Sequence, residues 1–166
     1  LDALLAAEAP WQVAANLPYS VGTAILRRLL PHHDLVSGLV VMLQRELAER
    51  VLALPGDRQH GLLALERAAW ADATRLFDVH PRVFRPVPRV TSTVLRLRLR
   101  PSAHEPRLLR QSLALASRAL TRPRKMLHNA VAPEPTAARI EAAGLDPAAR
   151  PATLALEDWI ALVRAS

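Results

Sequence analysis

Hydrophobic and polar residues follow two different periods in the first hundred positions of this chain. Short apolar runs predict strands at residues 11–15, 35–44 and 73–79. The stretch from Thr91 to Arg100 alternates between leucine and arginine, which predicts an antiparallel strand with one face in water. Apolar residues at helical spacing predict helices at 23–30, 45–54 and 61–71. Strands and helices that alternate in this way predict an α/β fold.

Three local features refine this picture. The 11–15 run ends in a loop that contains proline, so we expect a buried parallel strand that delivers this loop to the carboxyl edge of the sheet. Ser20 is expected to cap the helix that follows. In the 45–54 helix, the spacing predicts that Leu47, Val51 and Leu54 face the core.

Beyond Pro101 the composition shifts to Ala, Leu, Arg and Pro, and no strand pattern remains. We expect a linker at residues 101–106. Prolines separate four stretches that predict helices at 107–120, 124–132, 135–143 and 156–164. The sequence therefore predicts two domains, an α/β domain at 1–101 and a small helical domain at 102–166.

The charge of the chain points to a polyanionic partner. The net charge is +7 and the isoelectric point about 11.4. Lys125 is the only lysine among 22 basic residues. Arginine binds phosphate in bidentate fashion and stacks on bases, which favours nucleic acid, although a GC-rich genome gives the same bias.

Several classes of protein are disfavoured by the sequence. The absence of cysteine excludes disulfides and thiolate metal sites, and the six histidines form no pair at a spacing of four. The longest apolar run, at residues 35–43, is too short to cross a bilayer. No serine lies in a nucleophile elbow.

The tetrapeptide Asn16-Leu17-Pro18-Tyr19 is the strongest candidate for chemistry. Pro18 biases Leu17 toward an extended conformation, so that the Leu17 carbonyl can point outward as an acceptor. The amide oxygen of Asn16 is a second acceptor, and Tyr19 offers a flat face on which a ring can stack. Two acceptors and a ring suit the amino group of an adenine. Alternatively, the segment is a turn whose Asn16 caps the next helix.

Such a site would act on the amine through differential binding. The amine of adenine is a poor nucleophile because its lone pair is delocalised into the ring. Acceptors that suit a tetrahedral nitrogen would favour the pyramidal transition state over the planar ground state. This chemistry requires neither a metal nor a covalent intermediate.

An ordered set of motifs resembles one family of enzymes, the KsgA group of small-subunit ribosomal RNA adenine dimethyltransferases. The set covers the first hundred residues well and the remainder more loosely. Its pieces are Asp2-Ala3-Leu4, residues 16–20, residues 43–50, Gly61 with its helix, and residues 83–92.

The resemblance implies a fold and a reaction. The fold is the carboxyl half of a Rossmann-like class I methyltransferase sheet followed by a small all-α domain. The reaction transfers methyl groups from S-adenosyl-L-methionine, without a metal, to N6 of two adjacent adenosines near the 3′ end of small-subunit ribosomal RNA. The implied partner is the pre-30S particle, and the implied enzyme is a cytoplasmic monomer without a membrane.

The resemblance also implies roles for individual residues. Asp2 and Asn16 would contact the cofactor, Asn16 and the Leu17 carbonyl would orient the amine, and Tyr19 would enclose the base together with Phe84. From spacing alone Phe84 is equally compatible with a core position. The part of the domain that would grip the methionine end of the cofactor is missing, so we expect the chain to be inactive alone.

The helical part carries a basic segment that resembles the family's pattern imperfectly, because a proline interrupts it. By this resemblance RNA would be contacted by Arg118, Arg122, Arg124 and Lys125. A solvated helix start is the alternative for these residues.

Two other functions stay open. One is a large-subunit ribosomal RNA adenine N6-methyltransferase of the macrolide-resistance type, which shares the tetrapeptide. The other is a non-catalytic ribosome-assembly factor that binds RNA through the basic helical domain.

Overall fold

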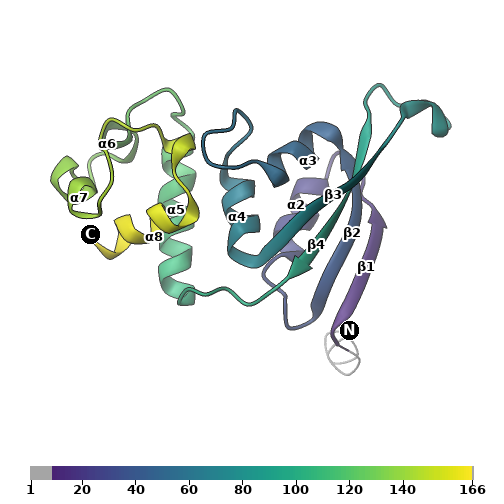
Figure 1. The fold of residues 1–166 in the computed structure, drawn as a ribbon, viewed down its shortest axis with the longest axis horizontal. Coiled ribbons are helices and arrows are strands. Elements are labelled where there is room, and N and C mark those ends of the chain that lie inside the picture. Colours follow the sequence, from purple (N-terminus) through teal and green to yellow (C-terminus); the bar gives the residue numbers. More distant parts are fainter. Residues whose placement is uncertain (1–8, 166) are drawn as a thin grey trace. The chain divides into compact units, whose positions relative to one another are not determined.

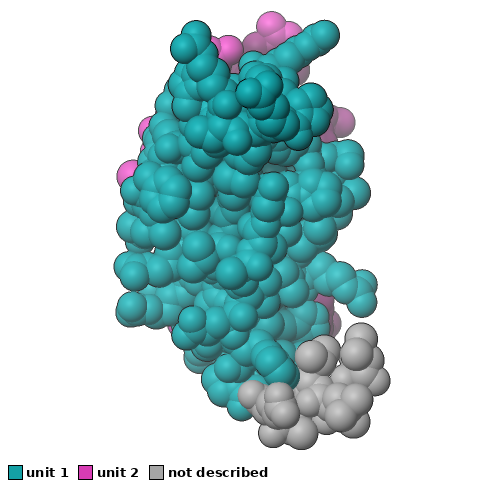
Figure 2. Space-filling view, turned by 90° about the vertical axis from the view of Figure 1, so that its right-hand side faces the viewer, with its two compact units in different colours: residues 1–52, 70–101 teal, residues 53–69, 102–166 magenta. Residues whose placement is uncertain are grey.

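The computed structural model describes residues 9–165, and the chain divides into two compact units (Figure 2). The first unit comprises Leu1–Leu52 and Trp70–Pro101, and the second comprises Ala53–Ala69 and Ser102–Ser166. Each unit is described by itself below.

The first unit is built on a mixed four-stranded sheet with the order β1-β2-β4-β3 (Figure 1). The strands are β1 (Trp11–Asn16), β2 (Val36–Gln44), β3 (Ala71–Val79) and β4 (Ser92–Leu99). Strand β1 runs parallel to β2, whereas β4 is antiparallel to both β2 and β3. The α/β class and the antiparallel nature of the last strand are confirmed.

Helices cover one face of this sheet. Figure 1 shows α2 (Gly22–Leu29) and α3 (Arg45–Leu52) on the same side of the strands. The leucines at alternate positions of β4 are fully or almost fully buried, and Leu95 and Leu97 pair with Val41 and Leu39 of β2. On the opposite face Val40 and Phe77 are exposed. The leucine and arginine alternation along β4 therefore separates a covered face from an open one.

Three of the finer expectations are wrong. Strand β1 is parallel but not buried, because within residues 9–165 it pairs with β2 alone and lies at the edge of the sheet. Ser20 does not cap α2, which begins after Val21 without any side-chain cap. Leu54 is 60% exposed, since α3 ends at Leu52 and the chain leaves the helix face before that position.

Strands β3 and β4 form a long hairpin whose end extends beyond the rest of the sheet (Figure 1). The connection contains a single turn of 3-10 helix, η1 (Pro81–Val83), capped by the ring of His80, whose Nδ1 accepts from the Arg82 amide at 3.2 Å. The following residues, with prolines at 86 and 88, form no helix or strand. Two prolines in three positions prevent a helix here, so the chain after η1 is a loop.

The second unit is helical. It contains α4 (Leu62–Trp70, its last residue assigned to the first unit), α5 (Pro106–Leu120), α6 (Leu127–Val131), α7 (Ala137–Ala142), η2 (Pro151–Thr153) and α8 (Leu156–Arg164). Glu105 caps α5 by accepting hydrogen bonds from the amides of Arg107 and Leu108, each at 2.8 Å. These bonds hold the pKa of Glu105 below its ordinary value. Trp159 of α8 is fully buried in this unit.

The two compact units differ from the predicted domains in one segment. Residues 53–69 group with the helices rather than with the sheet. Two hydrogen bonds connect this segment to the helical unit. The Gly56 amide donates to the Ala152 carbonyl at 3.0 Å, and the His60 ring is hydrogen-bonded to the same carbonyl at 2.9 Å. Helices α6 and α7 are also shorter than the sequence predicted.

Candidate active site

The candidate site begins where β1 ends. Asn16 is the last residue of the strand, and the Leu17 amide continues the parallel pairing by donating to the Met42 carbonyl at 3.2 Å. A turn then forms at Pro18, whose carbonyl accepts from the Val21 amide at 3.2 Å. The tetrapeptide is thus fixed on one side by the sheet and closed on the other by a turn.

The two predicted acceptors are both unoccupied by neighbouring groups. Asn16 is exposed, and its amide makes no hydrogen bond to any other residue that the structure describes. No described group donates to the Leu17 carbonyl either, although the Leu17 side chain itself is buried. An exposed amide oxygen and a free carbonyl in adjacent residues can accept both hydrogens of an amine.

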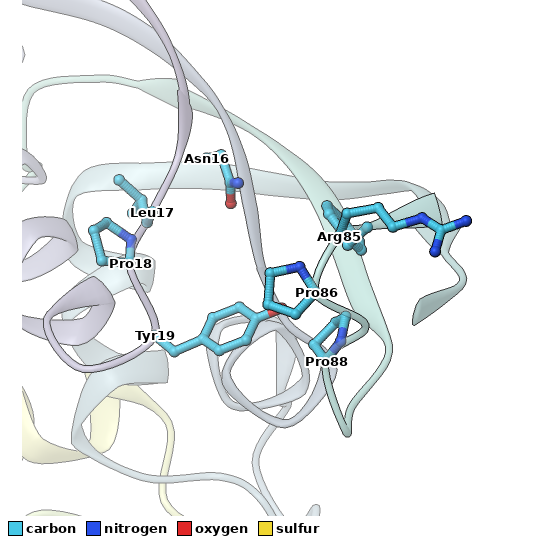
Figure 3. A pocket seen from close by; sticks show the side chains of 8 residues that line it. Asn16, Leu17, Pro18, Tyr19, Arg85, Pro86 and Pro88 are labelled. Atoms are coloured by element: carbon cyan, nitrogen blue, oxygen red, sulfur yellow. The ribbon is translucent and has the colours of Figure 1, made fainter. Parts of the chain in front are cut away.

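These acceptors border a pocket of about 390 Å³ (Figure 3). In the close-up the Asn16 amide is directed toward the space beside Tyr19 and Pro86. The loop between β3 and β4 supplies the other wall. The pocket is lined by Asn16, Leu17, Pro18, Tyr19, Phe84, Arg85, Pro86 and Pro88.

The pocket brings Tyr19 and Phe84 together although they are far apart in sequence. Tyr19 is 43% exposed, and Phe84, from the loop between β3 and β4, is half-buried and lines the same pocket. The Tyr19 hydroxyl hydrogen-bonds the Ser92 hydroxyl at 3.1 Å. Because the ring is held at its tip, its face is available to a planar group in the pocket.

A charged cluster stabilises the base of the hairpin that carries the second wall. Asp78 of β3 accepts from Arg45 at 2.5 Å, from Arg75 at 2.6 Å and from the Thr93 hydroxyl at 2.7 Å. The hydrogen bonds from Arg75, with those from Arg45 and Thr93, hold the pKa of Asp78 well below its ordinary range. The Arg45 amide also donates to the Thr91 carbonyl at 3.0 Å. The cluster thus ties the ends of β2, β3 and β4 together.

The remaining predicted site residues lie elsewhere. Asp2 is outside the described residues. The four basic residues all belong to the second unit and are exposed at the end of α5 or in the turn after it. No ion pair involving them is found within residues 9–165. They are Arg118, Arg122, Arg124 and Lys125.

Sequence reasoning missed three pocket residues. Arg85, Pro86 and Pro88 line the pocket beside Phe84, and Figure 3 shows the Arg85 guanidinium pointing away from the other side chains. The signal was present, since two prolines flanking an exposed position hold a loop open and keep neighbouring side chains on its surface. Arg85 thus places a positive charge at the rim of the pocket.

Metal and membrane features are not found in the described part of the chain. Over residues 9–165 no three His, Asp or Glu side chains gather as a metal site. Within the same residues no helix is long and apolar enough to span a membrane.

Fold and site together define a class of protein. The sheet combines a parallel strand pair with antiparallel strands, and an open pocket lies at the carboxyl edge of β1 and β2. This arrangement is typical of α/β proteins that bind a nucleotide-like group at that edge. A model of the family described as "Ribosomal RNA adenine dimethylase" matches residues 4–165. The chain belongs to this family.

Curated relatives agree with the family model. The chain is 37% identical over 166 residues to "Ribosomal RNA small subunit methyltransferase A" of Rhodospirillum rubrum, covering 99% of this chain and 58% of that protein. It is likewise 37% identical over 164 residues to the protein of the same name from Phenylobacterium zucineum, again covering 58% of it. The chain thus spans somewhat more than half the length of these relatives.

Solved structures share the fold. A dimethyladenosine transferase from Plasmodium falciparum matches 93% of this chain and 66% of its own with a TM-score of 0.77, at 22% identity. The 23S rRNA methyltransferase ErmE matches 98% of this chain and 68% of its own with a TM-score of 0.69, at 23% identity. The fold is therefore that of the Rossmann-like methyltransferases that modify ribosomal RNA.

Proposed function

We propose that the complete protein carrying this chain dimethylates N6 of two adjacent adenosines near the 3′ end of small-subunit ribosomal RNA. The observation that carries this proposal is the pocket lined by Asn16, Leu17, Tyr19 and Phe84, at which the Asn16 side-chain amide and the Leu17 carbonyl accept no hydrogen bond from any residue that the structure describes. Family membership and the names of the curated relatives support the choice of substrate.

The pocket would act on a base that has left its stack. Extrusion costs a few kcal/mol in a duplex and less in an unpaired loop. Stacking on an aromatic ring returns roughly 1–3 kcal/mol per base. With the ring between Tyr19 and Phe84, the amine would donate one hydrogen to Asn16 and the other to the Leu17 carbonyl. As the nitrogen becomes tetrahedral and gains positive charge, both acceptors bind it more strongly than the planar amine.

S-adenosyl-L-methionine is the proposed methyl donor and would supply an electrophilic methyl group. The residues that this chain offers to it are Asp2, as the resemblance implies, and Asn16, whose free exposed amide fits a polar contact at the strand end. We expect little affinity for the donor in this chain alone, which calorimetry with S-adenosyl-L-methionine would measure. Micromolar binding would show that this chain suffices to hold the donor and would contradict the expectation.

The decisive variant is Asn16→Ala in the complete protein. Removing one preorganised polar group that acts on the transition state lowers kcat by about 100-fold or more. Gln12→Ala is the matched control, because Gln12 is an exposed amide on the same strand and does not line the pocket. Methylation of ribosomal RNA at the wild-type rate by Asn16→Ala would refute the catalytic assignment.

The position of the methylated adenosines distinguishes small-subunit RNA from large-subunit RNA as the substrate. We expect primer extension to stop at two adjacent adenosines near the 3′ end of small-subunit RNA. The structural match to a 23S rRNA methyltransferase makes large-subunit RNA the competing substrate. A stop in large-subunit RNA alone would replace the proposed substrate by that alternative.

The second unit is proposed to bind RNA through its exposed cations. Four basic side chains form no ion pair among residues 9–165, and this favours binding to phosphate. Each cation that neutralises an RNA phosphate releases counterions that had condensed on the RNA. The double substitution Arg124→Gln with Lys125→Gln should weaken RNA binding and reduce the salt slope by about 0.7 per lost contact. Arg139→Gln is the control, because Arg139 is already paired with Glu134 at 3.2 Å. An equal effect of both changes would favour the solvated helix start instead.

The proposed partner in the cell is the pre-30S particle, and the proposed enzyme is a cytoplasmic monomer. Its high positive charge supports binding to an RNA-rich particle. Sedimentation of the complete protein with precursor particles but not with mature ones would test this partner. A non-catalytic assembly factor would bind the same particles and leave the adenosines unmethylated.

A further inference from the structure

Tyr19 carries a hydroxyl that stacking on a base does not require. A phenylalanine would present the same aromatic face, and the chain has a phenylalanine, Phe84, elsewhere in the lining of the same pocket. In the structure the Tyr19 hydroxyl is bonded to Ser92 across 73 positions of sequence, at 3.1 Å. The hydroxyl therefore has a partner, and that partner is outside the pocket lining.

Ser92 is placed where it can serve as an anchor. It is fully buried, with an exposed fraction of 0%. It is the first residue of β4 and lies between two strands, paired with Gln44 of β2 on one side and Val79 of β3 on the other. A buried hydroxyl that loses its partner cannot form a hydrogen bond with water instead, so breaking this hydrogen bond costs more free energy than breaking one at the surface.

Tyr19, in contrast, lies on a turn. It follows Pro18 directly and precedes the start of α2, and its ring is partly exposed. Without a bond at its tip the ring could adopt several staggered rotamers, of which only some face the pocket. The hydrogen bond between the two hydroxyls joins this ring to β4, the middle one of three hydrogen-bonded strands.

We propose that Ser92 is a positioning residue that fixes the Tyr19 ring as the stacking wall for the target base. This inference rests on the proposed function. Ser92 touches neither the base nor the methyl donor in this arrangement. It acts only through the Tyr19 hydroxyl, and this dependence makes the inference testable.

The test is a double-mutant cycle in the complete protein, with methyl transfer to ribosomal RNA as the readout. Ser92→Ala and Tyr19→Phe each remove one partner of the same hydrogen bond. We expect each change to lower kcat roughly three- to tenfold, and the double variant to be no worse than the poorer single one. KM for RNA should change little, because phosphate contacts supply most of the affinity.

Thr93→Val is the matched control. Thr93 is the next residue, its hydroxyl is also buried, and it donates to Asp78 rather than to Tyr19. Its effect should therefore multiply with that of Tyr19→Phe. Ser92→Thr keeps the hydroxyl and should restore activity toward the wild-type rate.

The outcomes distinguish the two proposals. If Ser92→Ala costs the same factor in a Tyr19→Phe protein as in the wild type, Ser92 acts independently of the ring and the inference is overturned. If the Ser92 variants do not fold, Tyr19→Phe alone decides, because wild-type kcat in that variant overturns the inference as well. A folded wild-type protein that methylates no RNA adenine would overturn the proposed function together with this inference.

Discussion

Replacing Phe84 by leucine tests whether the second wall of the pocket acts through its ring. Phe84 is half-buried and lines the same pocket as Tyr19. From the sequence alone it was equally compatible with a core position. Leucine keeps an apolar side chain at this place and removes only the aromatic face. A core residue would tolerate the exchange, whereas a stacking residue would not.

The expected magnitude follows from the two contributions that the ring makes. Contact of an aromatic ring with another ring adds about 0.5–1.5 kcal/mol beyond the area that it buries. Leucine retains most of the area term, so Phe84→Leu should lower kcat/KM by about 2- to 12-fold. Phe84→Ala loses the full stacking contribution of roughly 1–3 kcal/mol and should lower it by about 5- to 150-fold. Phe84→Ala should lower kcat/KM more than Phe84→Leu does, although the two expected ranges overlap.

The assay is single-turnover methylation of small-subunit RNA by the complete protein, followed by primer extension. Val83→Ala is the control, because Val83 is the preceding residue, is 67% exposed and does not line the pocket. Thermal unfolding of each variant separates a loss of stacking from a loss of fold. The reasoning is refuted if Phe84→Leu is as active as Val83→Ala, or if its activity falls only in proportion to its stability.

Three further predictions concern charge. Burial lowers the pKa of His60 in the folded protein below its ordinary 6.5. The stability that this shift contributes is therefore full above pH 6.5 and falls as the pH drops toward the lowered pKa. His60→Asn should remove this dependence of the unfolding free energy on pH, as unfolding curves at several pH values would measure. The lowered pKa of Asp78 likewise gives stability that is present above pH 3.8 and lost in stronger acid, and Asp78→Asn should abolish this loss in acid titrations. Arg85→Gln should weaken RNA binding and its salt slope by about 0.7, while Arg28→Gln, on the exposed face of α2, should leave both unchanged in filter binding.

The elements of the first unit were predictable because their patterns are local. The alternation from Thr91 to Arg100 identified β4, its antiparallel character and its separate wet and apolar faces without any knowledge of its neighbours. The helix at 45–54 was found from spacing, but its end was placed two residues late. Burial at a helix end depends on where the chain turns next, and this is information that a periodic pattern does not contain.

The exposed state of β1 and the place of residues 53–69 were not predictable in the same way. An apolar run predicts a buried strand only if neighbours exist on both sides, and the order of strands is a tertiary property. Residues 53–61 bond to Ala152 through Gly56 and His60, almost a hundred positions later. The composition change at Pro101 marked one boundary, and no composition change marked the other.

The pocket itself follows from strand directions that the sequence only partly specifies. Because β1 and β2 are parallel, Asn16 and Gln44 end at the same edge of the sheet. Because β4 runs in the opposite direction, its first residue, Ser92, pairs with Gln44, so the loop before β4 arrives at that same edge. A shift of this register by one residue would turn Ser92 to the other face and separate its hydroxyl from Tyr19. The reversal of β4 is therefore what brings the loop with Phe84 to the edge that carries the tetrapeptide, and its register is what places the Ser92 hydroxyl within hydrogen-bond distance of the Tyr19 hydroxyl.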